Sequence, residues 1–346
     1  MVRHTEAFLE KQRLRKIQKE EERKRKEQEG FNSPLREARR VKNDEFYTLE
    51  SDIEKELSHY PGKFKGKSVL CNCNDTVHTG FKDYFIKNFN NLGLSMLVCT
   101  GYMTDGMHGE VLTYDGKEER VKRLSGDGGF DSEECVRLLD ECDVVVTNPP
   151  FSLFRKFISM LISSGKEFII IGNLNAVTYM EVFPYMKDDK VWMGATCFNG
   201  GTAMFGAPKD SFDPEKMSKK CYGKTGDDGS FLWRVSGVRW FTNMEHDRRG
   251  TEITLDGVYS PSEYPKYDNY DAINVGRVSE IPCDYDGAMG VPISFMDKYS
   301  PSQFRILGLM CGTRGVEFVN GDDGRSKFFL GGKSVYARVI IRRRQQ

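Results

Sequence analysis

The residues best suited to chemistry in this sequence are Asn148-Pro149-Pro150-Phe151. An aromatic amine is a poor nucleophile because its lone pair is delocalised into the ring. Two oxygens that accept its hydrogens would free that lone pair, and the Asn148 side chain and the Pro149 carbonyl offer two. Successive prolines fix φ near about −65° and remove two N–H donors, so the loop is stiff and presents carbonyls. The Phe151 ring offers a flat face for stacking a base, worth about 1–3 kcal/mol.

The loop follows the run Asp143-Val144-Val145-Val146-Thr147 and precedes a helical pattern over residues 153–164. Three β-branched residues without polar alternation predict a parallel strand that is covered on both faces. Ligands of open α/β sheets bind at the carboxyl ends of such strands. An ordinary strand-to-helix turn is the simpler interpretation of the tetrapeptide alone, but its position after this strand favours a catalytic loop.

Short apolar runs alternate with helical stretches from about residue 67 onward. The pattern predicts strands at 68–71, 95–100, 143–147 and 167–172, helices at 80–90, 132–141 and 153–164, and a hairpin over 110–124. This alternation predicts an α/β sheet with helices on both faces. After about residue 190, loops lengthen and strands such as Val238–Thr242 look isolated, which indicates a loop-rich α+β region. We therefore expect three parts: a basic helical arm at 1–42, an α/β domain at 43–194 and the α+β region at 195–346.

The net charge of the chain is zero, so a nucleic-acid partner must be argued from local charge. Residues 1–42 carry 14 Lys and Arg against 8 Asp and Glu. They form either a solvent-facing tail or an arm that contacts phosphates. The nine cysteines are irregularly spaced and no metal-ligand spacing occurs, which favours reduced thiols and no metal. Without a signal peptide or an apolar span, we expect a cytoplasmic protein with no membrane partner.

Four stretches resemble the EcoRI-type modification methylases, a family of N6-adenine DNA methyltransferases. They span most of residues 42–310: Lys42–Thr48, Val69–Asp75, Val144–Phe154, and Tyr264–Val275 with Met289–Phe295 beyond it. The NPPF loop alone identifies only the wider amino-methyltransferase superfamily, and the other stretches are more specific. The resemblance implies a Rossmann-like S-adenosylmethionine-dependent methyltransferase sheet, followed by a target-recognition region over 195–346.

The activity that the resemblance implies is site-specific methylation of N6 of an adenine in double-stranded DNA. The methyl donor is S-adenosyl-L-methionine, a sulfonium whose leaving group is already good, so no metal is required. The adenine must be flipped out of the duplex, at a cost of a few kcal/mol. Such an enzyme acts within a restriction-modification system, beside a separate cognate restriction endonuclease, or as an orphan modifier.

The resemblance also implies where the donor binds. The segment with Phe46, Tyr47 and Thr48 closes over its methionine end. A further set of small polar residues replaces the usual glycine-rich turn: Cys71, Asn72, Cys73 and Asp75. Asp127, in a Gly-Asp-Gly-Gly turn that ends at Phe130, accepts a hydrogen bond from the adenine amine of the donor. The simpler interpretations are an interdomain linker and a plain Asp-Gly turn. The second strand lacks the usual acidic ribose ligand, so ribose binding is unassigned.

Two other functions fit the same residues. The acceptor geometry suits any planar amine, so the substrate is alternatively an adenine in RNA or a glutamine side chain in a protein. The missing glycines also allow a non-catalytic DNA-binding protein with a decayed donor site. Candidate base-reading residues lie in 195–346, each with a simpler interpretation as surface charge or core aromatic: Arg234, Arg239, Arg248, Arg249, Arg277, Arg314, Trp233, Trp240 and Tyr267.

Overall fold

The computed structural model describes residues 47–72, 80–103, 107–198, 202–206, 223–225, 231–311, 319–322 and 326–344. The expected basic arm at 1–42 lies outside these residues, as do Phe46, Cys73 and Asp75. Within the described ranges, no helix is both long and apolar enough to span a membrane.

The largest element is an eight-stranded sheet in the order β5-β4-β3-β2-β6-β7-β12-β8. Its strands are β2 (Ser68–Cys71), β3 (Met96–Gly101), β4 (Glu110–Tyr114), β5 (Glu119–Arg123), β6 (Val144–Thr147), β7 (Glu167–Asn173), β8 (Trp192–Cys197) and β12 (Val238–Thr242). The central strands β3, β2, β6 and β7 are parallel, and the β4–β5 hairpin pairs antiparallel with β3. The strands and the hairpin expected from the sequence over 68–172 are thus confirmed within one or two residues.

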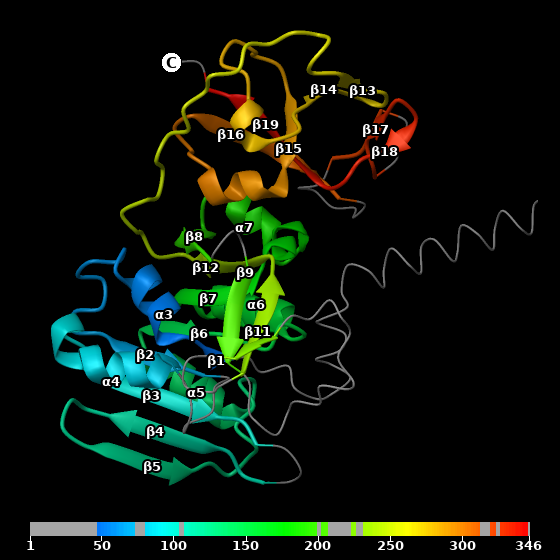
Figure 1. Ribbon diagram of the computed structural model, residues 1–346. Coiled ribbons are helices and arrows are strands. Elements are labelled where there is room, and N and C mark those ends of the chain that lie inside the picture. Colours follow the sequence, from blue (N-terminus) through cyan, green and yellow to red (C-terminus); the bar gives the residue numbers. More distant parts are fainter. Residues whose placement is uncertain are drawn as a thin grey trace, which may run out of the picture.

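Helices cover both faces of this sheet, as the apolar runs predict (Figure 1). They are α3 (Glu50–Leu57), α4 (Gly80–Leu92), α5 (Glu133–Glu141) and α6 (Phe154–Ser164). Because strand side chains alternate in direction, Val69 and Cys71 of β2 pack with α3 and α4, whereas Leu70 packs with α5 and α6. Val144, Val145 and Val146 divide between the two faces in the same way. The expected fold class, a Rossmann-like α/β sheet with helices on both faces, is confirmed.

Strand β12 corrects one expectation, because Val238–Thr242 is not isolated. It pairs antiparallel with β7 on one side and with β8 on the other. All five of its residues are buried, since both of its edges and both of its faces are covered. The boundary expected between residues 194 and 195 therefore falls inside β8, and the main sheet takes one further strand from beyond it.

A small second sheet joins the start of the described chain to its middle. Its order is β1-β9-β11-β10, with β1 at Tyr47–Thr48, β9 at Thr202–Gly206, β10 at Gly223–Thr225 and β11 at Phe231–Ser236. Thr48 pairs with Phe205 in an antiparallel register. Strand β1 therefore lies at one edge of this sheet, next to β9, in the middle part of the molecule (Figure 1).

The C-terminal part forms a five-stranded sheet in the order β13-β14-β15-β19-β16. These strands are β13 (Lys266–Tyr267), β14 (Tyr270–Asn274), β15 (Met289–Pro292), β16 (Phe304–Met310) and β19 (Arg338–Arg343), with a β17–β18 hairpin at Phe329–Leu330 and Lys333–Ser334. The short helices η1 (Leu174–Thr178), α7 (Phe183–Lys187), η5 (Val278–Glu280) and η6 (Ile293–Lys298) complete the fold. One continuous hydrophobic core includes both Phe157 of α6 and Val291 of β15, so this sheet packs firmly on the rest of the protein.

Candidate active site

The strand order reverses between β2 and β6. The chain leaves β2 through α4 toward β3 on one side, and it later returns to build β6 and β7 on the other side. At such a switch point the two connections diverge and leave a crevice outside the carboxyl ends of the strands. Asn72 follows β2 and Asn148 follows β6. The expected catalytic loop and part of the expected donor site therefore lie on the two sides of the same switch point.

A buried hydrogen bond ties these two strand ends together. The Thr147 hydroxyl donates to the carbonyl oxygen of Asn72. Both residues are fully buried, so the contact is shielded from water. The Asp143 carboxylate joins the opposite ends of the same strands, accepting from the Ser68 amide and hydroxyl at 2.8 Å each. These hydrogen bonds hold the pKa of Asp143 below its ordinary value.

The Asn148–Phe151 loop turns from β6 into α6, with Asn148 on its buried side. Asn148 is 7% exposed and Pro149 is buried, whereas Pro150 and Phe151 are half-buried. The Leu153 amide donates to the Pro150 carbonyl at 2.9 Å, which closes the turn before α6 begins. The Phe151 ring meets Phe205 edge to face, with their centroids 6.4 Å apart. The position of the Phe151 ring is thus fixed by its contact with Phe205 of β9.

Thr48, near the start of the described chain, contacts the Asn148–Phe151 loop. Its Oγ1 accepts a hydrogen bond of 3.3 Å from Asn148 Nδ2, and Thr48 is 4% exposed. Gly80 at the start of α4 packs against the same segment, because a Cβ at Gly80 would lie 2.2 Å from the Thr48 carbonyl oxygen. Tyr47 lies beside Thr48 in β1 and pairs with Gly206. The segment expected to close over the donor therefore crosses the carboxyl ends of the central strands.

Cys71 lies too deep to contact a ligand with its side chain. It is fully buried at the end of β2, in register with Cys99 of β3. Burial raises the pKa of its thiol well above the ordinary value. Asn72, also fully buried, contributes its carbonyl oxygen to the contact with Thr147. Of the four residues expected to replace the glycine-rich turn, these two are thus buried at the end of β2.

Asp127 lies in a tight loop at the end of β3. The Met103 amide, just beyond β3, donates to the Asp127 carbonyl at 2.9 Å. The carboxylate is exposed, and its Oδ1 accepts from the Gly129 amide at 2.9 Å. Gly128 follows with a φ of 82°, and a Cβ there would lie 2.3 Å from the Gly101 carbonyl oxygen. Only glycine allows this close approach, which holds Asp127 beside the strand end.

Phe130 closes the same loop but points into the protein. It is 5% exposed, and its ring lies edge to face with Phe157 of α6 at 5.0 Å between centroids. The Lys156 ammonium lies 5.9 Å above the same ring. Phe130 therefore anchors the Asp127 loop to the hydrophobic core between α5 and α6.

Several candidate base-reading residues serve the fold instead. Arg239 forms a two-pronged ion pair with Asp297 of η6, at 2.7 Å and 2.9 Å, with side chains 10% and 12% exposed. Arg249 stacks 3.5 Å above the Trp192 ring and pairs with Asp189 and Glu245.

The two aromatics described among these candidates are buried: Trp240 is 1% exposed and Tyr267 is 5% exposed. For these two, the interpretation as core aromatics is confirmed. Arg234 and Arg248 are exposed, and Arg277 is exposed beside Glu280. Arg314 and the Trp233 side chain lie outside the described part of the chain.

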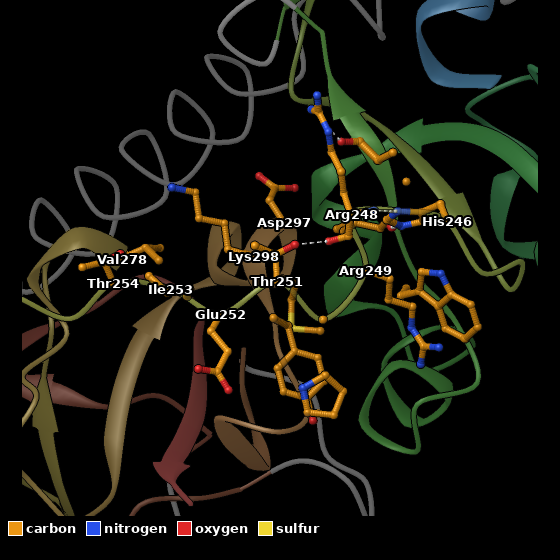
Figure 2. Close-up of a pocket in the computed structure, with 18 of the residues that line it drawn as sticks. His246, Arg248, Arg249, Thr251, Glu252, Ile253, Thr254, Val278, Asp297 and Lys298 are labelled. Atoms are coloured by element: carbon orange, nitrogen blue, oxygen red, sulfur yellow. Dashed lines mark hydrogen bonds between the residues drawn. The ribbon is translucent and has the colours of Figure 1, made fainter. Parts of the chain in front are cut away.

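Two cavities lie between the main sheet and the C-terminal sheet. One of about 690 Å³ opens beside η1, which directly follows β7, and its lining includes Asn175, Lys327 and the exposed Tyr336. It therefore lies at the same end of the sheet as the catalytic loop. The other, of about 590 Å³, lies around Trp192, His246 and Arg249 (Figure 2). Trp192, which lines this second cavity, is the first residue of β8. The second cavity therefore lies at the opposite end of the sheet.

A mixed α/β sheet with polar loops at its switch point has the architecture of a Rossmann-like methyltransferase. Residues 34–344 match the family described as adenine-specific methyltransferase EcoRI. The chain belongs to this family of adenine-specific methyltransferases. The resemblance drawn from four sequence stretches is thereby confirmed, and so is adenine as the substrate class, in place of the alternative of a protein glutamine.

Similar proteins agree with this assignment. The type II methyltransferase M.MpnI of Mycoplasma pneumoniae is 38% identical over 89% of this chain and 97% of its own length. The type II methyltransferase M.EcoRI of Escherichia coli is 37% identical over 91% of this chain and 97% of its own. A third, M.MgeORF184P of Mycoplasma genitalium, is 35% identical over 89% and 98%. No solved structure matches the chain.

Proposed function

We propose that this enzyme transfers a methyl group from S-adenosyl-L-methionine to N6 of a flipped-out adenine in double-stranded DNA. The observation that carries the proposal is that the ends of β2 and β6 flank the switch point of the sheet, with Asn148 on one side. Donor and base must meet at one point, and open α/β sheets bind their ligands at such a switch point.

In this proposal Asn148 and Pro149 supply the two acceptors. The Asn148 Oδ1 and the Pro149 carbonyl oxygen accept the two hydrogens of the N6 amine, which draws the nitrogen toward tetrahedral geometry. Phe151, held by Phe205, stacks on the extruded base. When bound, the donor supplies an electrophilic methyl group on a sulfonium. The amine nitrogen would form its new N–C bond while the methyl C–S bond of the donor breaks, so that the sulfur leaves as a neutral thioether, and the amine would release one proton to water.

The residues beside the crevice fit the donor. Asp127 presents an exposed carboxylate at the end of β3, and its Oδ2 has no hydrogen bond among the described residues. A carboxylate oxygen of this kind accepts readily from an amine such as that of the donor's adenine. In this proposal Phe46, Tyr47 and Thr48 contact the methionine end of the donor, and Cys73 and Asp75 also bind it. We assign Cys71, Asn72 and Phe130 to holding the walls of this pocket.

Target recognition belongs to residues beyond β8 in this proposal. The cavity beside η1 lies at the same end of the sheet as Asn148, and Lys327 and Tyr336 lie on its C-terminal side. A duplex placed there would present its groove to the C-terminal sheet and its extruded base to the catalytic loop. The relatives named above are type II methyltransferases, which supports a role in a restriction-modification system beside a separate endonuclease.

The decisive experiment is long-read sequencing of DNA from cells that express the protein. We expect N6-methyladenine at one position of one recurring sequence. Purified protein is then incubated with labelled donor and either duplex DNA, RNA or a protein extract. Label that entered RNA or protein but not duplex DNA would overturn the proposal.

A further inference from the structure

One cation close to the Asn148–Phe151 loop has no acidic partner in the described part of the chain. Arg155 lies in the first turn of α6 and is exposed. The neighbouring Lys156 pairs with Asp131, whereas Arg155 forms no ion pair with any described carboxylate. The first turn of α6 contains no acidic residue, and a positive charge is unfavourable there because the helix macrodipole is also positive at this end. The charge of Arg155 is therefore available to a binding partner.

The guanidinium of Arg155 is held in place by an aromatic ring. Its Cζ lies over the ring of Tyr179, 4.0 Å from the ring centroid. Tyr179 directly follows η1, packs against the main hydrophobic core, and accepts at its carbonyl oxygen from the Val182 amide at 3.1 Å. An arginine that rests on a ring still presents the N–H groups along its edge, and two of them can bind one phosphate together. The contact thus orders the side chain and leaves its donors available.

This pair lies at the end of the main sheet where the extruded adenine is proposed to bind. Strands β6 and β7 are parallel neighbours, so the Asn148–Phe151 loop and η1 leave the sheet at the same end. Arg155 follows the first of these connections and Tyr179 follows the second. The adjacent Thr178 lines the cavity of about 690 Å³ at this end. A cation with free donors therefore lies close to the proposed positions of both the base and the duplex.

A nucleotide that leaves the duplex turns by about 180° about its backbone, so the strand beside it must be held. Arginine contacts to phosphates fix the position of a protein on a duplex without reading sequence. Leu153 and Met180, which are 44% and 48% exposed, flank the pair in sequence and offer apolar surface to the adjoining sugars. We propose that Arg155, held by Tyr179, binds a backbone phosphate of the target strand next to the extruded adenine. This inference rests on the proposed function and deepens it.

The test compares two variants that each remove one exposed arginine. Arg155→Ala removes the proposed contact, and Arg120→Ala on the edge strand β5 makes the same change of charge elsewhere. Binding of a duplex oligonucleotide is measured by fluorescence anisotropy over a series of salt concentrations. We expect Arg155→Ala to bind about tenfold more weakly at about 0.1 M salt and to lower the slope of log K against log salt by about 1, since one phosphate contact is lost. Arg120→Ala should match the wild type in both quantities.

A second measurement locates the phosphate. Neutral methylphosphonates replace the phosphates one at a time around the target adenine of the sequence found by long-read sequencing. At one position the wild type should lose about tenfold in affinity, whereas Arg155→Ala should lose no more than about twofold there, because its contact is already absent. Urea denaturation of Arg155→Ala covers the alternative that the arginine only joins α6 to η1. A purely structural pair would lower the free energy of unfolding and leave the salt slope unchanged.

An unchanged salt slope in Arg155→Ala, an equal loss of slope in Arg120→Ala, or an Arg155→Ala variant that responds like the wild type to every phosphate replacement would each overturn the inference. Wild-type protein that methylates no duplex DNA would overturn the proposed function instead. In that case the salt slopes, measured on a duplex of mixed sequence, still decide whether Arg155 binds phosphate.

Discussion

The buried carboxylate of Glu56 is bound twice by Thr196, through the backbone amide at 2.8 Å and through the hydroxyl at 2.5 Å. The Ala195 amide and the Tyr60 hydroxyl donate to the other oxygen, each at 2.8 Å. Glu56 is 0% exposed, so these four donors replace the water that the charge loses on folding. Burial and the nearby Glu56 carboxylate raise the pKa of Tyr60, which keeps the phenol protonated as a donor.

Replacing Glu56 with glutamine should therefore destabilise the protein. The amide presents an NH2 where the carboxylate accepts, which leaves at least one buried backbone N–H of β8 without a partner. We expect the free energy of unfolding to fall by about 2–3 kcal/mol, measured by urea denaturation. Glu54→Gln, on the exposed side of the same helix, is the matched control. Equal stability of the two variants would contradict the role assigned to Glu56.

The parallel core of the fold could be read from the sequence because its signals are local. Runs such as Val144–Val146 are apolar without alternation, and they predicted buried strands at the correct positions. The NPPF loop was placed correctly at a strand end for the same reason. The polar residue types around it suggested chemistry, and the resemblance to a family supplied the substrate class.

Contacts between distant segments could not be read in this way. Strand β1 has two residues, too few for any periodicity, and its pairing with Phe205 depends on the folded sheet. Strand β12 looked isolated because its partner β7 lies about 65 residues earlier in the chain. Arg239 looked available for DNA because its ion-pair partner, Asp297, is distant in the sequence and no neighbouring residue indicates the pairing. The sequence does contain one signal that Glu56 is buried. Glu56 lies three residues after Ile53 and four before Tyr60, so a helix places its charge on the same apolar face as these two residues.

Gly128 offers a test of the Asp127 loop. Its φ of 82° and its contact with the Gly101 carbonyl leave no room for a Cβ. Gly128→Ala should shift Asp127 away from the end of β3 and weaken donor binding by about tenfold or more, since such strain costs about 1–3 kcal/mol. Gly126→Ala should bind within about twofold of wild type, because its nearest neighbour would be 3.9 Å away. Calorimetry with S-adenosylmethionine measures the donor affinity of both variants. Normal donor affinity in Gly128→Ala would contradict the proposed role of Asp127 in binding the donor.

His246 should make stability depend on pH. Burial lowers the pKa of this imidazole, whose Nε2 lies 3.1 Å from the Met193 carbonyl oxygen while the Arg248 amide donates to Nδ1. The imidazole of His246 is therefore protonated less readily in the folded protein than in the unfolded chain. Neutral His246 therefore contributes to the free energy of unfolding. This contribution is fully present above the ordinary histidine pKa of about 6.5, and it is lost as the pH falls through the lowered pKa of the folded state. His246→Gln should flatten the decline in unfolding free energy below about pH 6.5, followed by urea denaturation at a series of pH values; an unchanged slope would argue against it.

Asn148→Ala tests the catalytic loop itself. The variant removes one of two proposed acceptors while the ends of β2 and β6 stay joined through Thr147 and Asn72. Because an oriented polar group acts mainly on the transition state, we expect the single-turnover rate to fall by about 10²–10³-fold. Donor affinity should stay within about threefold, since Asn148 serves the base rather than the donor. Asn90→Ala, on the exposed side of α4, controls for the loss of an asparagine amide elsewhere in the fold. If Asn148→Ala turned over within a few-fold of wild type, the amine would have to be activated by some other group.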